Sequence, residues 1–153
     1  MSWKKKALLT LLIVFIAIQF IQPAHNKNEQ VLPTDIVEMY NVPLNVQSVL
    51  KTSCYDCHSN NTRYPWYFSI QPLGWMLNKH VNEGKENLNF SELGSYSERK
   101  RANKFRAIAK SINDGTMPLS QYTIMHKDAK LTTDAKTLLI NWTEKMKNSL
   151  TTK

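Results

Sequence analysis

The chain has 153 residues, a formal net charge of +8, two cysteines and four glycines. This length allows one domain with a single core, and the sequence contains neither internal repeats nor the glycine-rich phosphate-binding and HExxH motifs of common enzymes. Arg99-Lys100-Arg101 is the only basic run outside the N-terminus, so the charge favours a solvated surface over a nucleic-acid interface. The alternative is docking to an acidic partner or to anionic lipid headgroups.

The N-terminus has the pattern of an export segment. Lys4-Lys5-Lys6 precedes Ala7 to Ile21, which contains no charged residue. We therefore expect residues 1–24 to be a signal anchor or a signal peptide. About 20 apolar residues are needed to cross a bilayer, so the run is short, but Gln22-Pro23-Ala24 is a poor cleavage site and favours an uncleaved anchor. Both alternatives place the rest outside the cytoplasm, on the periplasmic side of the inner membrane or free in the periplasm.

The remaining chain divides into a polar linker, expected at residues 25–42, and a domain at residues 43–150. The linker is polar and contains Pro33. Apolar residues in the domain recur at helical spacing, and no segment alternates with a period of two for long enough to predict a strand. We therefore expect an all-α domain with long loops.

Four helices are predicted in the domain. The first runs from Pro43 into Cys54, and the second from Pro72 to a stop at Gly84. The third opens with a capping box in Ser95-Tyr96-Ser97-Glu98 and ends before Gly115. The fourth starts at Thr132 and carries an apolar stripe formed by Ala135, Leu138, Leu139, Trp142 and Met146.

The only cysteines occur in the pentapeptide Cys54-Tyr55-Asp56-Cys57-His58. A redox dithiol usually follows a strand, and none is predicted before this pair. A zinc site needs four ligands, yet the other histidines, His25, His80 and His126, stand alone. A disulfide leaves His58 without a role. Covalent haem attachment uses all three residues, with two thioethers and one axial imidazole, and it agrees with export.

A sixth iron ligand is expected far from this motif. Met117 follows the third predicted helix and precedes Pro118, which stiffens the chain at that point. His80 and His126 are the alternative ligands, and an open site is the third alternative. Met76 and Met146 lie on apolar helical stripes, where methionine ordinarily fills the core.

Three segments carry a family resemblance: CYDCHSNNTRYPWY, GWMLNKHVNEGKENLNFSE and GTMPLSQYTIMHKDAKLT. Over residues 43–147 the chain resembles the bacterial haem-binding domain family with its CxxCH motif, and more broadly class I cytochrome c. The resemblance implies one haem c attached through Cys54 and Cys57, with His58 as proximal and Met117 as distal ligand. It also implies a carrier of single electrons that works with redox partner proteins and is not an enzyme.

The resemblance also suggests minor roles. Pro65 is expected to offer its carbonyl to the proximal imidazole, and Arg63 to meet a haem propionate or lie on the surface. Trp142 is expected to pack the last helix against the first. The aromatic residues Trp66, Tyr67 and Trp75 would line the haem or fill the core, and Asn82–Ser97 would be an added polar loop.

Two rival functions remain from the sequence. A haem-based gas sensor or a peroxidase-like enzyme would keep an open distal face. A structural or metal-binding domain would use the cysteines without haem.

Overall fold

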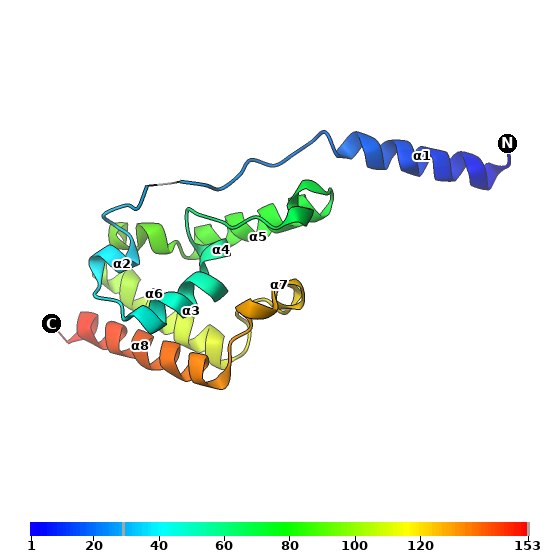
Figure 1. The fold of residues 1–153 in the computed structure, drawn as a ribbon. Helices are drawn as coiled ribbons and strands as arrows, with labels where there is room; N and C mark the ends of the chain where they lie inside the picture. Colours follow the sequence, from blue (N-terminus) through cyan, green and yellow to red (C-terminus); the bar gives the residue numbers. More distant parts are fainter. Residues whose placement is uncertain (29, 153) are drawn as a thin grey trace.

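In the computed structural model, which describes residues 1–28 and 30–152, the chain is all-α, as predicted. These residues form eight α-helices and three 3-10 helices and contain no strand (Figure 1). In chain order the elements are α1 (Trp3–Ile18), α2 (Ile36–Met39), α3 (Leu44–Ser53), α4 (Tyr55–His58), η1 (Trp66–Ser69), α5 (Leu73–Asn87), η2 (Phe90–Ser95), α6 (Glu98–Asn113), α7 (Ser120–Met125), η3 (Lys127–Ala129) and α8 (Thr133–Thr151).

Helices α6 and α8 pack against each other and form the centre of the core. Their N-termini are capped by the side chains of Ser97 and Thr132, each of which accepts a bond from a backbone N–H in the first turn. The apolar stripes of the two helices meet where the rings of Phe105 and Trp142 lie 5.7 Å apart in an edge-on arrangement. Trp142 therefore anchors the last helix in the core, with its ring against α6.

Three predicted boundaries are wrong in detail. Ser97, not Ser95, caps α6, because Ser95 lies in η2. Helix α5 passes through Gly84 and ends three residues later, at Asn87. The expected polar loop over Asn82–Ser97 is instead the end of α5 followed by η2, whose Phe90 and Leu93 are fully buried.

The core begins before residue 43, where the linker was expected to end. Asp35 caps the short helix α2 through a bond from the backbone N–H of Val37. The first residue of α2, Ile36, is completely buried, and Val42 is also in the core. The linker prediction failed here because α2, with four residues, is too short for its apolar residues to show a helical period.

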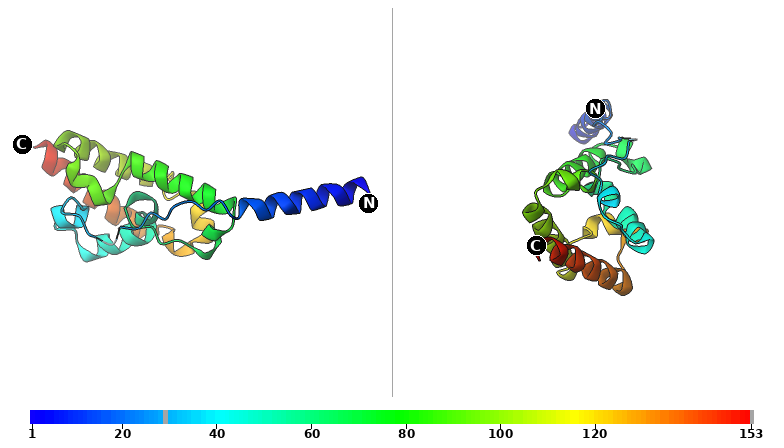
Figure 2. Two further views of the ribbon diagram at one scale, coloured as in Figure 1. Left: turned by 90° about the horizontal axis from the view of Figure 1, so that it is seen from above. Right: turned by 90° about the vertical axis from the view of Figure 1, so that its left-hand side faces the viewer.

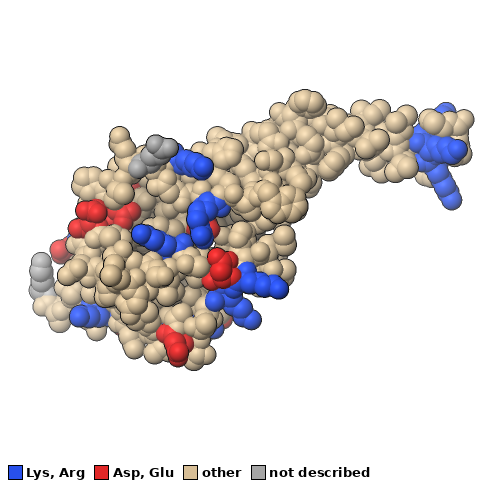
Figure 3. Space-filling view, in the orientation of Figure 1, with Lys and Arg blue, Asp and Glu red and all other residues tan. Residues whose placement is uncertain are grey.

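Helix α1 extends away from the rest of the chain, with the N-terminus at its far end (Figures 1 and 2). None of its residues is buried. In the described part of the chain, no helix combines the length and the apolar character needed to cross a membrane. Blue lysine atoms mark the tip of α1 in Figure 3, and its remaining surface shows no charged atoms in that view.

Candidate haem site

The CxxCH pentapeptide begins with a break between two helices and continues as a single helical turn. Cys54 has non-helical backbone angles, φ −129° and ψ −39°, so it separates α3 from α4. The turn that follows directs Cys54, Cys57 and His58 towards one cavity of about 420 Å³. This cavity is bounded by α4, α5, α6 and the loop that leads into α7.

The imidazole of His58 is oriented by two backbone carbonyls. Its Nδ1 lies 2.9 Å from the carbonyl oxygen of Gly84 and 3.0 Å from that of Leu88. Because a carbonyl only accepts, Nδ1 carries the proton and Nε2 keeps its lone pair in the neutral ring. Burial lowers the pKa of His58 and so favours this neutral form. The ring is therefore prepared to ligate iron through Nε2.

This arrangement corrects the expectation for Pro65. The Pro65 carbonyl accepts a bond from the backbone N–H of Phe68, at 3.0 Å, within η1. The end of α5 supplies the carbonyls for His58 instead. Sequence spacing could not reveal this, because the donor and acceptors are 26 and 30 residues apart.

Gly84 also lets α5 approach the motif closely. A Cβ atom placed on Gly84 would lie 2.4 Å from the carbonyl oxygen of Cys57, far inside van der Waals contact. The absence of a side chain thus brings the Gly84 carbonyl within reach of His58. The glycine that the sequence marked as a helix stop is required inside the helix for packing.

We expect Gly84→Ala to destabilise the domain by about 1–3 kcal/mol, since the clash exceeds the roughly 1 kcal/mol that alanine gains in a helix interior. Urea unfolding monitored by circular dichroism would measure it. Asn82→Ala, at an exposed position of the same helix, is the matched control and should change stability by less than about 0.5 kcal/mol. Equal stability of the two variants would contradict the packing role of Gly84.

Met117 lines the same cavity as the motif. It lies in the loop after α6, where its backbone N–H is 3.3 Å from the carbonyl oxygen of Ser111, and its residue surface is 38% exposed. Gly115, with φ +68°, ends α6 and turns the chain into this loop. The two segments that the sequence singled out for iron ligands, 59 residues apart (117 − 58), thus meet at one cavity.

The two alternative histidines differ in position. His80, on α5, also lines the cavity. His126 does not line it, and its Nε2 lies 2.7 Å from the hydroxyl oxygen of Tyr67 while its ring stacks on Tyr122. Of these two, only His80 is placed to compete with Met117.

Apolar side chains form most of the remaining wall: Leu88, Phe90, Ile108, Ile112, Leu119 and Leu131. Lys104 supplies a cation at the same wall. Such a mixture, with few polar groups at defined places, is typical of cofactor sites. Two thiols, one imidazole with a free Nε2 and one thioether on an apolar cavity fit the donor set of haem c.

The aromatic residues Trp66, Tyr67 and Trp75 do not line this cavity. Trp66 is 77% exposed and belongs to neither the site nor the core, so both expectations for it are wrong.

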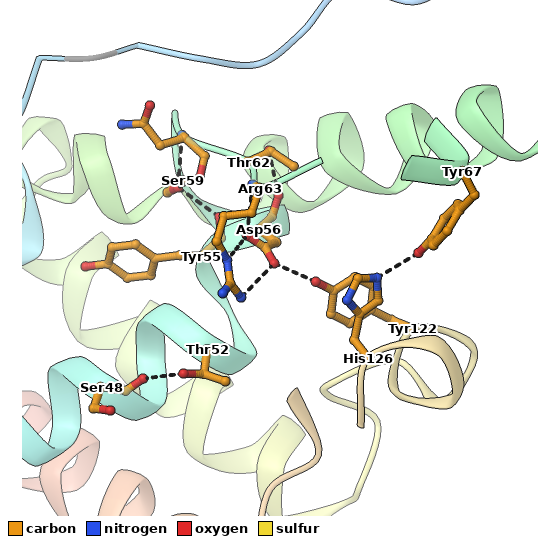
Figure 4. Close-up of polar contacts among 11 residues, drawn as sticks. Ser48, Thr52, Tyr55, Asp56, Ser59, Thr62, Arg63, Tyr67, Tyr122 and His126 are labelled. Atoms are coloured by element: carbon orange, nitrogen blue, oxygen red, sulfur yellow. Dashed lines mark hydrogen bonds and ion pairs between the residues drawn. The ribbon is translucent and has the colours of Figure 1, made fainter. Parts of the chain in front are cut away.

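Asp56, between the two cysteines, is the residue that sequence reasoning missed. Its buried carboxylate accepts bonds from the backbone N–H and the guanidinium of Arg63, and from the hydroxyl of Tyr122 at 2.6 Å. Figure 4 shows the carboxylate between these two partners. Arg63 is thus a partner of Asp56, not a cavity-lining residue that could meet a propionate.

This hydrogen-bond network ties the haem motif to the loop that carries Met117. Tyr122 lies on α7, five residues after Met117, and burial followed by its bond to Asp56 raises the pKa of its hydroxyl. No residue of α7 is buried. The bond from Tyr122 to Asp56 is therefore a principal attachment of this segment to the motif.

We expect Tyr122→Phe to lower the free energy of unfolding by about 1.5–3 kcal/mol, the range for a hydrogen bond to a charged group. Chemical denaturation of the haem-loaded protein would measure the change. Tyr55→Phe is the control, because the buried Tyr55 hydroxyl has no hydrogen-bond partner among the described residues and its removal should not destabilise. If Tyr122→Phe lowered the free energy of unfolding no more than this control, the network would not stabilise the attachment of the Met117 loop to the motif.

The cysteine thiols differ from those of redox-active pairs. Burial raises the pKa of Cys54 to about 12 and that of Cys57 to about 11, with smaller effects from the neighbouring thiol and from Asp56. A reactive dithiol needs the opposite shift. Nor do the described residues contain a group of three or more His, Cys, Asp or Glu side chains placed to hold a metal ion.

An all-α domain whose CxxCH motif and oriented histidine face an apolar cavity defines the class of haem-binding proteins. Residues 13–145 match the model of the family described as haem-binding domain, and the chain belongs to this family. The match starts 30 residues before position 43 (43 − 13), so it includes part of α1 and the segment expected to be a linker. Comparison with curated proteins and with solved structures gave no match.

Proposed function

We propose that the chain is an exported, membrane-attached cytochrome that holds one haem c covalently and transfers single electrons. The observation that carries the proposal is the convergence of Cys54, Cys57, His58 and Met117 on one apolar cavity. Redox proteins are its partners, nucleic acid is not, and the domain lies on the periplasmic side of the inner membrane.

Each residue has a defined role. The thiols of Cys54 and Cys57 would form thioethers with the haem vinyl groups. His58, oriented by the carbonyls of Gly84 and Leu88, would bind the iron through Nε2. Met117 would supply a thioether as the second protein ligand. Haem, when bound, supplies an iron centre that cycles between the ferrous and ferric states.

Electron transfer makes few other demands on the protein. Apolar side chains form most of the cavity wall, and the network around Asp56 links the motif to the Met117 loop. No general base or substrate pocket is needed, so the proposal does not include an enzymatic activity.

The decisive experiment is the spectrum of the full chain produced together with haem-maturation machinery. The protein should retain haem through denaturing electrophoresis and, when oxidised, show the weak far-red absorption band of sulfur bound to ferric iron. Haem lost on denaturation would refute covalent attachment. A spectrum without the far-red band would refute methionine ligation.

His80 supports a second candidate function. Because it lines the same cavity as the partly exposed Met117, a haem-based gas sensor or peroxidase-like enzyme could use it near an open distal face. Carbon monoxide binding by the ferrous protein distinguishes the two functions. Rapid binding would favour the sensor or enzyme, and slow binding that requires ligand displacement would favour the electron carrier.

A further inference from the structure

The segment that follows α1 is bonded to the domain along its length. Its first contact is a cluster that we call the glutamine junction, formed by Gln19, Gln22 and Gln71. The backbone N–H of Gln71 donates to Gln19 Oε1 at 2.9 Å, and Gln19 Nε2 donates back to the Gln71 carbonyl at 3.2 Å. Gln71 Nε2 donates to Gln22 Oε1 at 2.9 Å. Gln71 is completely buried by these contacts and its surroundings.

Contacts continue beyond the junction. The indole N–H of Trp75 donates to the Ile21 carbonyl at 2.8 Å. Asn26 donates to the Ser59 carbonyl at 2.8 Å and accepts from Lys85 Nζ at 2.6 Å. These bonds connect the segment both to α5 and to the residue that follows His58. Residues 19–28 are therefore a fixed strut between α1 and the haem motif, not a free tether.

An apolar surface surrounds the glutamine junction. Six exposed side chains form this surface, which we call the apolar collar: Phe20, Ile21, Trp66, Ile70, Leu73 and Met76. Bonds from Gln22 to the Ser69 carbonyl and from Trp75 to Ile21 place the two parts of the collar next to each other. Exposed fractions of 84% for Phe20 and 77% for Trp66 are unusual for side chains of this size.

The two sequence segments that contribute the collar lack charged residues. Residues 7–26 and 64–78 contain no Asp, Glu, Lys or Arg. Figure 3 shows the corresponding neck between the lysine tip of α1 and the domain free of charged atoms on the visible face. The surface from α1 to the collar is thus uncharged on this face.

We propose that the collar lies in the interface of the membrane that holds α1, so that the strut fixes the orientation of the haem domain on the bilayer. The inference rests on the proposed membrane attachment and deepens it. Helix α1, with 16 residues, is about 24 Å long against a hydrocarbon core of about 30 Å, and the collar extends the apolar stretch beyond its end. Exposed tryptophan is typical of this depth.

A lipid surface accounts for these features better than a second copy of the chain. A protein contact on the collar would leave the continuous apolar surface of α1 unexplained, because no residue of α1 is buried. One bilayer covers both surfaces. The fixed orientation would also present the same side of the haem site to every redox partner that approaches the membrane.

The first test places a nitroxide spin label at the collar of the full, haem-loaded chain. Both native cysteines are consumed by haem, so Trp66→Cys gives a single labelling position, and Asn141→Cys on the exposed side of α8 is the control. In vesicles of phosphatidylcholine and phosphatidylglycerol, we expect the label at position 66 to be relaxed mainly by oxygen. The label at position 141 should be relaxed mainly by an aqueous nickel chelate.

Equal access of the nickel chelate to both labels would overturn the collar proposal. Spin–spin broadening at position 66 that persists in detergent would overturn it in favour of a second copy. Release of the unmodified protein from membranes by alkaline carbonate would instead refute membrane attachment itself. An unchanged haem spectrum verifies that each labelled variant is folded.

The second test concerns the strut. Distances between labels introduced by Ser2→Cys and Asn141→Cys should form a narrow distribution in vesicles, because α1 is held by the glutamine junction. Adding Gln22→Ala, an exposed change that removes bonds to Gln71 and Ser69, should broaden the distribution at least about twofold. Asn148→Ala is the matched control and should leave the width unchanged. A broad distance distribution in the doubly labelled protein without Gln22→Ala or Asn148→Ala would overturn the fixed orientation.

Discussion

Replacing Met117 by leucine is expected to abolish the far-red band of the oxidised protein while the haem stays covalently attached. Leucine keeps the apolar volume but removes the sulfur donor, so the distal side of the iron loses its protein ligand. The reduction potential should fall, because a thioether ligand favours the ferrous state. Absorption spectroscopy of the oxidised protein and potentiometric titration measure the two effects.

Met125→Leu is the matched control for this experiment. Met125 lies at the end of α7, is 60% exposed and does not line the cavity. The far-red band and the reduction potential of this variant should therefore equal those of the unmodified chain. A far-red band that survives Met117→Leu but disappears in Met125→Leu would assign the iron ligand to Met125 and not to Met117. A second variant, His80→Phe, should retain the band, and loss of the band in it would indicate that His80 organises the distal face.

The positions of these candidate ligands relative to the helices could be predicted from the sequence. Gly115 and Thr132 mark a helix end and a helix start that the structure confirms, since each signal acts within a few residues. Met117 is the favoured ligand because it follows such an end and precedes Pro118, and the family resemblance implies the same pairing with His58. Helical periodicity alone does not say which loops meet in space.

The features that sequence reasoning missed depend on contacts between distant residues. Asp56 reads as a variable position between two cysteines, yet its partner Tyr122 is 66 residues away. Gly84 reads as a helix stop, and only its approach to Cys57 shows why a side chain is excluded. Residues 19–28 were predicted as the end of the export segment followed by the start of the linker. Their contacts were missed because amide side chains and backbone groups, which carry no periodic pattern, make them.

The largest expected effect belongs to the thioether bonds. The double substitution Cys54→Ala with Cys57→Ala should eliminate haem that survives denaturation, whereas either single substitution should leave the cofactor on one bond. Haem staining after denaturing electrophoresis, compared with total protein, provides the measurement. Undiminished staining in the double variant would contradict attachment through this motif.

The double variant also separates covalent attachment from haem binding as such. His58, its two carbonyl partners and the apolar wall remain in the variant. Added haem should therefore still bind, now reversibly, and show the absorption spectrum of haem iron bound by imidazole. Without haem, a cavity of about 420 Å³ lined by apolar side chains is left in the domain, and unfolding should require less denaturant than in the loaded protein. Restored resistance on titration with haem would show that the cavity binds the cofactor and that the cysteines serve to make this binding irreversible.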